Sequence, residues 1–138
     1  MTPNRIKPEP PKRVGPVPPP DPEGNGAHPV FAFMQCSVGF GLGDLSDEHK
    51  LAILKVIESK MTMTWAQIVT GGHNRMGSHT VRRSAFTSPI PDWVQDDDTL
   101  ISISFGQSMQ RIIGVRRSSL FLIGWFDPNG NAYDHGRR

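Results

Sequence analysis

The chain has 138 residues, of which 36% are hydrophobic, and its formal net charge is +2 at neutral pH. This length and composition support a single folded domain. The longest apolar run, Leu120 to Phe126, is much shorter than the roughly 20 residues that cross a bilayer, and no signal-peptide pattern is present. The single cysteine, Cys36, excludes an internal disulfide. We therefore expect a soluble, intracellular protein of the cytoplasm that makes no membrane contact.

The first residues of the chain differ in composition from the rest. Nine of the thirteen prolines fall between Pro3 and Pro22, among lysines and arginines and with few large apolar side chains. Such a segment buries too little surface to offset the entropy lost on ordering. The sequence thus predicts a basic, proline-rich, disordered tail over residues 1–29 and one α+β domain over residues 30–138.

The domain is expected to begin with a strand and a helix. The segment Val30 to Cys36 is rich in apolar and aromatic residues and ends near a glycine-rich stretch, which is typical of a strand. Ser46 then precedes two acidic residues that suit the first turn of a helix, and apolar residues follow at helical spacing. This pattern predicts a helix over about residues 47–60.

A second, shorter helix is expected next. Thr64-Trp-Ala-Gln67 has the form of a capping box and predicts a helix over about residues 65–70, ending at two glycines. The region from Gly71 to Asp98 is typical of loops, with Val81 to Phe86 as a candidate edge strand.

Three strands are expected in the last third of the chain. Thr99 to Phe105 alternates in polarity and Arg111 to Arg116 alternates imperfectly, whereas Ser119 to Phe126 is almost continuously apolar. The continuous run favours an inner strand covered on both faces. The connection from Arg116 to Ser119 allows only a hairpin, and Asp127-Pro-Asn-Gly130 predicts a type I turn.

The predicted order is therefore strand, helix, helix, strand, strand, strand (β-α-α-β-β-β). We expect a mainly antiparallel sheet of about four strands, with both helices packed on one face. Its core would contain Phe31, Phe33, Leu54, Ile57, Trp65, Ile101, Ile103, Phe121, Ile123 and Trp125.

The charges are unevenly distributed along the sequence. Two segments contain arginines without acidic residues, and the acids concentrate near Asp44 to Glu48 and in Asp92 and Asp96 to Asp98. A basic face opposite an acidic edge would suit RNA or an acidic protein partner. A solvated surface carrying charges of both signs fits the same pattern.

The end of the chain carries a family resemblance. Arg111-Ile-Ile-Gly-Val-Arg116, a short hairpin, Leu-Phe-Leu-Ile-Gly-Trp-Phe-Asp-Pro-Asn and then Tyr133-Asp-His135, together with the order of elements, resemble small bacterial toxins of the RelE/ParE/YoeB superfamily. The resemblance implies a RelE-like fold, a metal-independent endoribonuclease activity on RNA and neutralisation by an antitoxin. ParE-like members share the fold but act on gyrase.

The resemblance also implies site residues. It nominates Arg111, Arg116 or Arg117, Tyr133 and His135. RNA cleavage by the 2′-hydroxyl needs a base, an acid and cationic donors to the phosphorane. On that chemistry we assign catalytic roles to His135, Arg111, Arg117 and Tyr133, whereas the general base stays unidentified. RNA contacts are expected from Arg75, His79, Arg82, Arg83 and Arg116.

No cofactor and no metal ion are expected, because the histidines and acids lack paired ligand spacing. The alternative function is a non-enzymatic interaction module, such as a phage or accessory protein, whose basic face holds an acidic partner while the tail serves as a tether. Strand arginines can also serve only to keep a sheet edge soluble.

Overall fold

The computed structural model describes residues 24–70, 78–105 and 109–134. The predicted disordered tail lies outside the described residues except for residues 24–29. The helices and strands are β1 (Val30–Phe33), α1 (Asp47–Lys60), α2 (Trp65–Thr70), β2 (Ser78–Val81), β3 (Thr99–Ser104), β4 (Arg111–Arg117) and β5 (Leu120–Asp127), with short 3₁₀ helices at Leu42–Asp44 and Arg83–Ala85.

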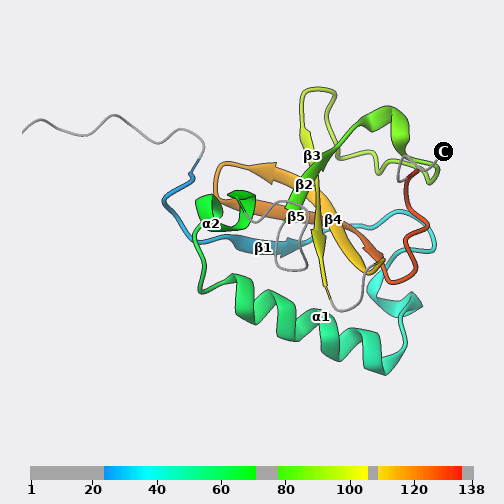
Figure 1. Cartoon of the computed structure of the whole chain (residues 1–138). Helices are drawn as coiled ribbons and strands as arrows, with labels where there is room; N and C mark the ends of the chain where they lie inside the picture. Colours follow the sequence, from blue (N-terminus) through cyan, green and yellow to red (C-terminus); the bar gives the residue numbers. More distant parts are fainter. Residues whose placement is uncertain (1–23, 71–77, 106–108, 135–138) are drawn as a thin grey trace, which may run out of the picture.

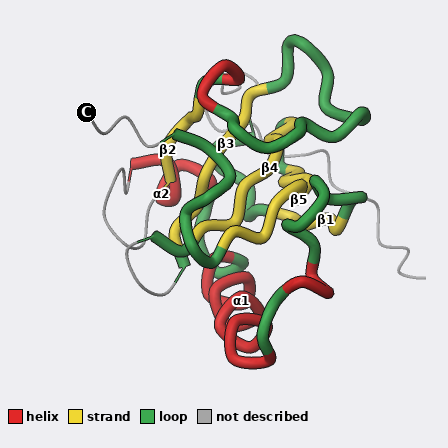
Figure 2. The backbone as a smooth tube through the Cα atoms, turned by 90° about the vertical axis from the view of Figure 1, so that its right-hand side faces the viewer, coloured by secondary structure: helices red, strands yellow, loops and turns green. Residues whose placement is uncertain are grey.

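The strands form one mixed sheet in the order β1-β5-β4-β3-β2. β1 runs parallel to β5, and the other neighbouring strands pair antiparallel. Figure 2 shows the strands in this order, with β1 and β2 at opposite edges. The fold is α+β with two helices, as predicted.

The predicted strand count and order of elements were wrong. The sheet has five strands, because β2 (Ser78–Val81) adds a strand between the helices and β3. Val81 to Phe86 was a candidate edge strand, but the strand that forms ends at Val81 and a 3₁₀ turn follows. β2 is short and polar, so its sequence has no alternating apolar pattern that would predict a strand. It is a strand because it pairs with β3.

Both helices begin as predicted. The Ser46 hydroxyl accepts the backbone N–H of His49 at 3.1 Å and so caps α1. At α2, Thr64 Oγ1 accepts the Gln67 N–H at 3.2 Å, and Gln67 Oε1 accepts the Thr64 N–H at 2.9 Å. This reciprocal pair is the expected capping box.

Two apolar cores lie on opposite faces of the sheet. Both helices contribute to one core, and the segment between β2 and β3 covers the other face (Figures 1 and 2). The helix-side core contains Leu45, Ile53, Trp65, Ile68, Ile101, Ile103, Phe105, Ile112, Phe121, Ile123 and Phe126. The loop-side core contains Val94, Leu100, Ile113, Val115, Leu122, Trp125, Ala132 and Tyr133.

Two residues of the predicted core are exposed instead. Phe33 retains 54% of its accessible surface and Leu54 retains 55%. Phe33 is on the edge strand β1, so no strand covers its outer side, and Leu54 lies on the outer flank of α1. Trp125 is buried, but in the loop-side core rather than beside Phe121.

The described part of the predicted tail contacts α2. The carbonyl of Ala27 accepts the Trp65 N–H, and the carbonyl of Asn25 accepts the Ala66 N–H, both at 2.9 Å. Within the described ranges, no helix has both the length and the apolar character needed to cross a membrane.

Candidate functional site

The three arginines of β4 do not share one face of the sheet. Arg116 lies on the helix side, where its guanidinium is 4.3 Å from the centroid of the Trp65 ring. Arg117, the next residue along the strand, points to the loop side and contacts Asp98. Alternation along a strand sends neighbouring side chains to opposite faces. The strand therefore does not present its arginines as one basic face.

Arg117 is engaged in an ion pair. Its Nε donates to Asp98 Oδ1 at 2.9 Å, its Nη2 donates to Asp98 Oδ2 at 2.6 Å, and Nη2 also reaches the carbonyl of Trp93 at 3.2 Å. These hydrogen bonds lower the pKa of the Asp98 carboxyl, although partial burial opposes them. The same bonds raise the pKa of Arg117. Arg117 therefore anchors the segment between β2 and β3 to the sheet.

Arg116 joins the start of the described chain to the sheet. Its Nη2 donates to Asn25 Oδ1 at 2.7 Å, and its Nε donates to the carbonyl of Ser118 at 2.8 Å. Stacking on Trp65 adds a cation–π contact. The predicted RNA contact of Arg116 thus competes with three contacts inside the protein.

Of the remaining predicted RNA-binding residues, Arg82 and Arg83 follow each other directly after β2. Arg83 donates to the carbonyl of Gln95 at 3.2 Å and lies 3.7 Å from Asp96 Oδ1. Arg82 is exposed. Two acids of the predicted acidic edge therefore contact predicted basic residues: Asp96 lies beside Arg83, and Asp98 pairs with Arg117. Arg75 and His135 lie outside the described residues.

The structure does bring Tyr133 and His79 together. Tyr133 Oη lies 3.2 Å from His79 Nε2 and donates to Ser102 Oγ at 3.0 Å. With the tyrosine proton given to Ser102, a His79 ring protonated at Nε2 donates to the tyrosine oxygen. Tyr133 is buried, whereas His79 is only partly buried. The tyrosine hydroxyl is thus central in a short hydrogen-bonded chain.

A turn after β5 positions Tyr133. The buried carboxylate of Asp127 accepts the backbone N–H groups of Asn131 and Ala132, each at 2.9 Å. Gly130 takes a positive φ of 74° within this turn, as its placement in the predicted turn allows. Tyr133 then forms a β-bridge with Phe86, and their rings lie 5.5 Å apart.

Arg111 lies on the same face as Tyr133. It pairs with Ser104 on one side and Asp127 on the other, and its Nη1 donates to Ser104 Oγ at 3.2 Å. Ser104 and Ser102 are alternate residues of β3, so they share this face about 7 Å apart. We call His79, Ser102, Ser104, Arg111 and Tyr133 the tyrosine cluster.

Sequence reasoning nominated three members of the tyrosine cluster and missed its two serines. Ser102 is fully buried although it is polar, and it lies in the otherwise apolar run of β3. The alternation of Ser102 and Ser104 with Ile101, Ile103 and Phe105 was the available signal. Buried hydroxyls of this kind require hydrogen-bond partners, and here Tyr133 and Arg111 supply them.

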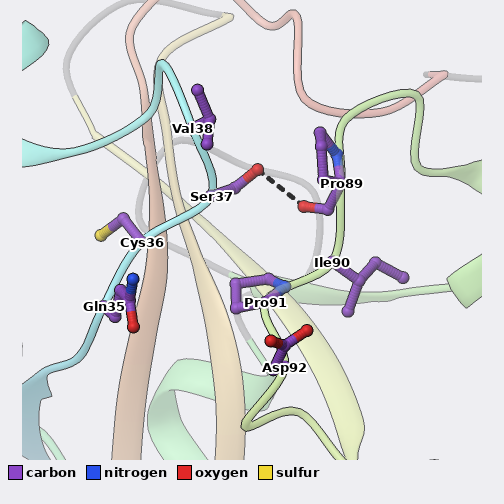
Figure 3. A pocket seen from close by; sticks show the side chains of 8 residues that line it. All are labelled: Gln35, Cys36, Ser37, Val38, Pro89, Ile90, Pro91 and Asp92. Carbon is purple, nitrogen blue, oxygen red and sulfur yellow. Dashed lines mark hydrogen bonds between the residues drawn. The ribbon is translucent and has the colours of Figure 1, made fainter.

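A shallow groove lies elsewhere, between the segment after β1 and the segment before Trp93 (Figure 3). Ser37 Oγ donates to the carbonyl of Pro89 at 2.6 Å across it. The Cys36 side chain points away from the Pro89 side, and burial, together with nearby Asp44, raises the pKa of its thiol. The groove encloses about 190 Å³ and is lined by Gln35, Cys36, Ser37, Val38, Pro89, Ile90, Pro91 and Asp92. None of these was nominated from the sequence, and none belongs to the tyrosine cluster.

Among the described residues, no three histidine, cysteine or acidic side chains gather as metal ligands would. Comparisons of the chain with family models, with curated proteins and with solved structures found no match.

Proposed function

We propose that this protein is a small RelE-like toxin that cleaves RNA without a metal ion, and that the tyrosine cluster is its active site. The observation that supports the proposal is the hydrogen-bonded chain from His79 through Tyr133 to Ser102, with Arg111 on the same face of the sheet. The reaction needs a base, an acid and cationic donors, and an imidazole, a phenol and a guanidinium can supply them.

Each group has a role in the proposed reaction. His79, when neutral, removes the proton of the 2′-hydroxyl, whose oxygen then attacks the adjacent phosphorus. Arg111 donates to the phosphate oxygens, which gain negative charge in the phosphorane. The bond from phosphorus to the 5′-oxygen breaks, and the Tyr133 hydroxyl, which donates to Ser102 in the free protein, instead donates its proton to that oxygen. The products are a 2′,3′-cyclic phosphate and a free 5′-hydroxyl.

This assignment differs from the sequence-based one in two respects. His79 moves from RNA binding to proton transfer and fills the place of the unidentified base. Arg117 leaves the catalytic set, because its Nε and Nη2 groups both donate to Asp98. His135 lies outside the described residues and keeps its proposed catalytic role, as acid or base.

The test uses purified protein, free of any partner, and RNA in the presence of EDTA. Tyr133→Phe keeps the ring that packs on Phe86 and removes only the hydroxyl. We expect this variant, His79→Gln and Arg111→Ala each to lose about 10²-fold or more of the cleavage rate. Product ends are read by their resistance to ligation, since a cyclic phosphate blocks the 3′ end.

Lys55→Ala is the matched control for loss of positive charge, because Lys55 is exposed on α1 and belongs neither to the tyrosine cluster nor to the predicted RNA contacts. It should cleave RNA at close to the rate of the unmodified protein. Intact RNA with the unmodified chain would overturn the proposed function. Normal cleavage by folded Tyr133→Phe and Arg111→Ala variants would overturn the assigned site.

The alternative proposal, a non-enzymatic module with a basic face for an acidic partner, has less support. Arg83 and Arg117 already pair with Asp96 and Asp98, and Arg116 is engaged by Asn25 and Trp65. An antitoxin that neutralises the cleavage activity is part of the toxin proposal. Its binding would be measured as inhibition of the EDTA-resistant cleavage.

A further inference from the structure

The two edges of the sheet differ in character. β2 carries Ser78, His79 and Thr80 and is followed by two arginines, so it has the polar and charged residues that keep an edge from pairing. β1 has the sequence Val-Phe-Ala-Phe without a charged residue. Val30 and Phe33 retain 53% and 54% of their accessible surface. Within the described residues, no strand lies beyond β1 (Figure 2).

The outer backbone groups of β1 can be identified from its pairing with β5. The N–H groups of Val30 and Met34 donate to carbonyls of Ser119 and Ile123. In a parallel ladder, alternate residues direct both backbone groups to the same neighbour. Phe31 and Phe33 therefore direct their N–H and C=O groups away from β5.

We propose that a second copy of this chain pairs with this edge, so that the two β1 strands run antiparallel across a two-fold axis and join the sheets of both copies. A two-fold contact must be self-complementary. Centring it on Ala32 places Phe31 opposite Phe33 of the other copy, and each such pair exchanges both backbone hydrogen bonds. This inference is independent of the RNA-cleaving proposal.

The side chains fit this register. Phe31 and Phe33 contact Phe121 and Phe126 of the helix-side core, so both lie on that face of the sheet. Across the axis each exposed Phe33 meets a Phe31, which gives aromatic cross-strand pairs of a favourable kind. The two Ala32 residues face each other in the non-hydrogen-bonded position, where strands approach closely and small side chains fit.

The contact is small compared with standard interfaces of about 1,200–2,000 Å². We therefore expect a monomer–dimer equilibrium that depends on protein concentration. Sedimentation equilibrium of the full chain over a wide concentration range measures it. Phe33→Lys should shift the dissociation constant upward by at least tenfold, because it places a charge next to the two-fold axis, opposite Phe31 of the other copy.

Leu54→Lys is the matched control, because Leu54 on α1 is exposed to the same degree, 55%. It should leave the dissociation constant unchanged. A monomer at every concentration overturns the proposal. A dimer that dissociates with Leu54→Lys but persists with Phe33→Lys also overturns it, since α1 would then form the interface.

A cross-link tests the register even if Phe33→Lys fails to fold. With Cys36→Ser as background, Ala32→Cys should form an intermolecular disulfide under mild oxidation, because facing residues of a non-hydrogen-bonded pair have suitable spacing. Val30→Cys should not link to itself, since residue 30 faces Met34 of the other copy. Linking of Val30→Cys in place of Ala32→Cys would overturn the proposed axis.

Discussion

The guanidinium of Arg117 was expected from the sequence to bind phosphate, but in the structure it forms an ion pair with Asp98. Its partner Asp98 is almost buried, with 7% of its side chain exposed, whereas the Arg117 side chain is 37% exposed. Two parallel hydrogen bonds between these groups attach the C-terminal end of the segment between β2 and β3 to the sheet. This segment covers the loop-side core. A charge in this setting stabilises the protein rather than binding phosphate.

We predict that Arg117→Ala lowers the free energy of unfolding by about 1–2 kcal/mol near neutral pH. The change removes charged hydrogen bonds and leaves a nearly buried carboxylate, but solvent reaches the pair and weakens it. The pKa of Asp98 is lowered in the folded protein, so the stabilisation is present above the ordinary carboxyl pKa near 4 and is lost as the pH falls through that of the folded state.

The stability difference between the unmodified protein and Arg117→Ala should therefore shrink as the pH falls below about 4. Urea unfolding at a series of pH values measures it. Arg82→Ala, at an exposed position, should show no such difference. A pH-independent gap would show that the Asp98 contact does not account for the effect.

At the scale of elements, the hairpin of β4 and β5 contains a bulge that decides which face each side chain occupies. Ile113 pairs with Trp125, and the next residue, Gly114, pairs with Ile123, so Gly124 is the extra residue. After the bulge, Trp125 points to the loop side although Ile123 points to the helix side. The same shift places Asp127 where it caps the turn before Tyr133.

We predict that Gly114→Ala destabilises the protein by about 2–3 kcal/mol, in the range of overpacked cores. A Cβ at this position would lie 2.1 Å from the Leu122 carbonyl oxygen, so the backbones of β4 and β5 would have to separate. Thermal unfolding followed by circular dichroism measures the loss. Gly43→Ala is the control, because a Cβ there meets nothing within 4 Å; equal effects of the two changes would refute the steric cause.

At the scale of the whole molecule, the central strands belong to both cores. β5 is buried from Phe121 to Asp127 and contributes to the helix-side core and the loop-side core alike. Unfolding of either core would displace β5, and this displacement would disrupt the packing of the other core. The two cores should therefore unfold as one cooperative unit.

Tryptophan fluorescence can test this prediction, because Trp65 reports on the helix side and Trp93 and Trp125 on the loop side. A Trp65→Phe variant and a Trp93→Phe/Trp125→Phe variant each leave the signal of one core. Within each variant, the fluorescence midpoint in urea should coincide with that of far-UV circular dichroism. Separate midpoints would show that the cores unfold independently.

The parts of the fold that depend on local sequence were predictable. The cap at Ser46, the box at Thr64 and the apolar period between them defined both helices correctly. The final hairpin was also found, because its strands are long and the connection is short.

The parts that depend on distant contacts were not predictable. β2 is a strand because β3 lies beside it, and the apolar pattern of α1 does not show that Leu54 is exposed while its neighbour Ile53 is buried. The partners of the arginines come from segments far along the chain, such as Asn25 for Arg116. For the candidate site, Arg111, Tyr133 and His79 could be nominated from the sequence. That they lie together, and that Ser102 bonds to Tyr133, follows only from the register of the sheet.

The parallel pairing of β1 with β5 has a consequence for the protein during its synthesis. Val30 pairs with Leu120, so the first strand has no neighbour in the sheet until the last strand has left the ribosome. Throughout elongation, the segment Val-Phe-Ala-Phe is therefore unprotected on both sides, in a form that chaperones and other nascent chains can bind.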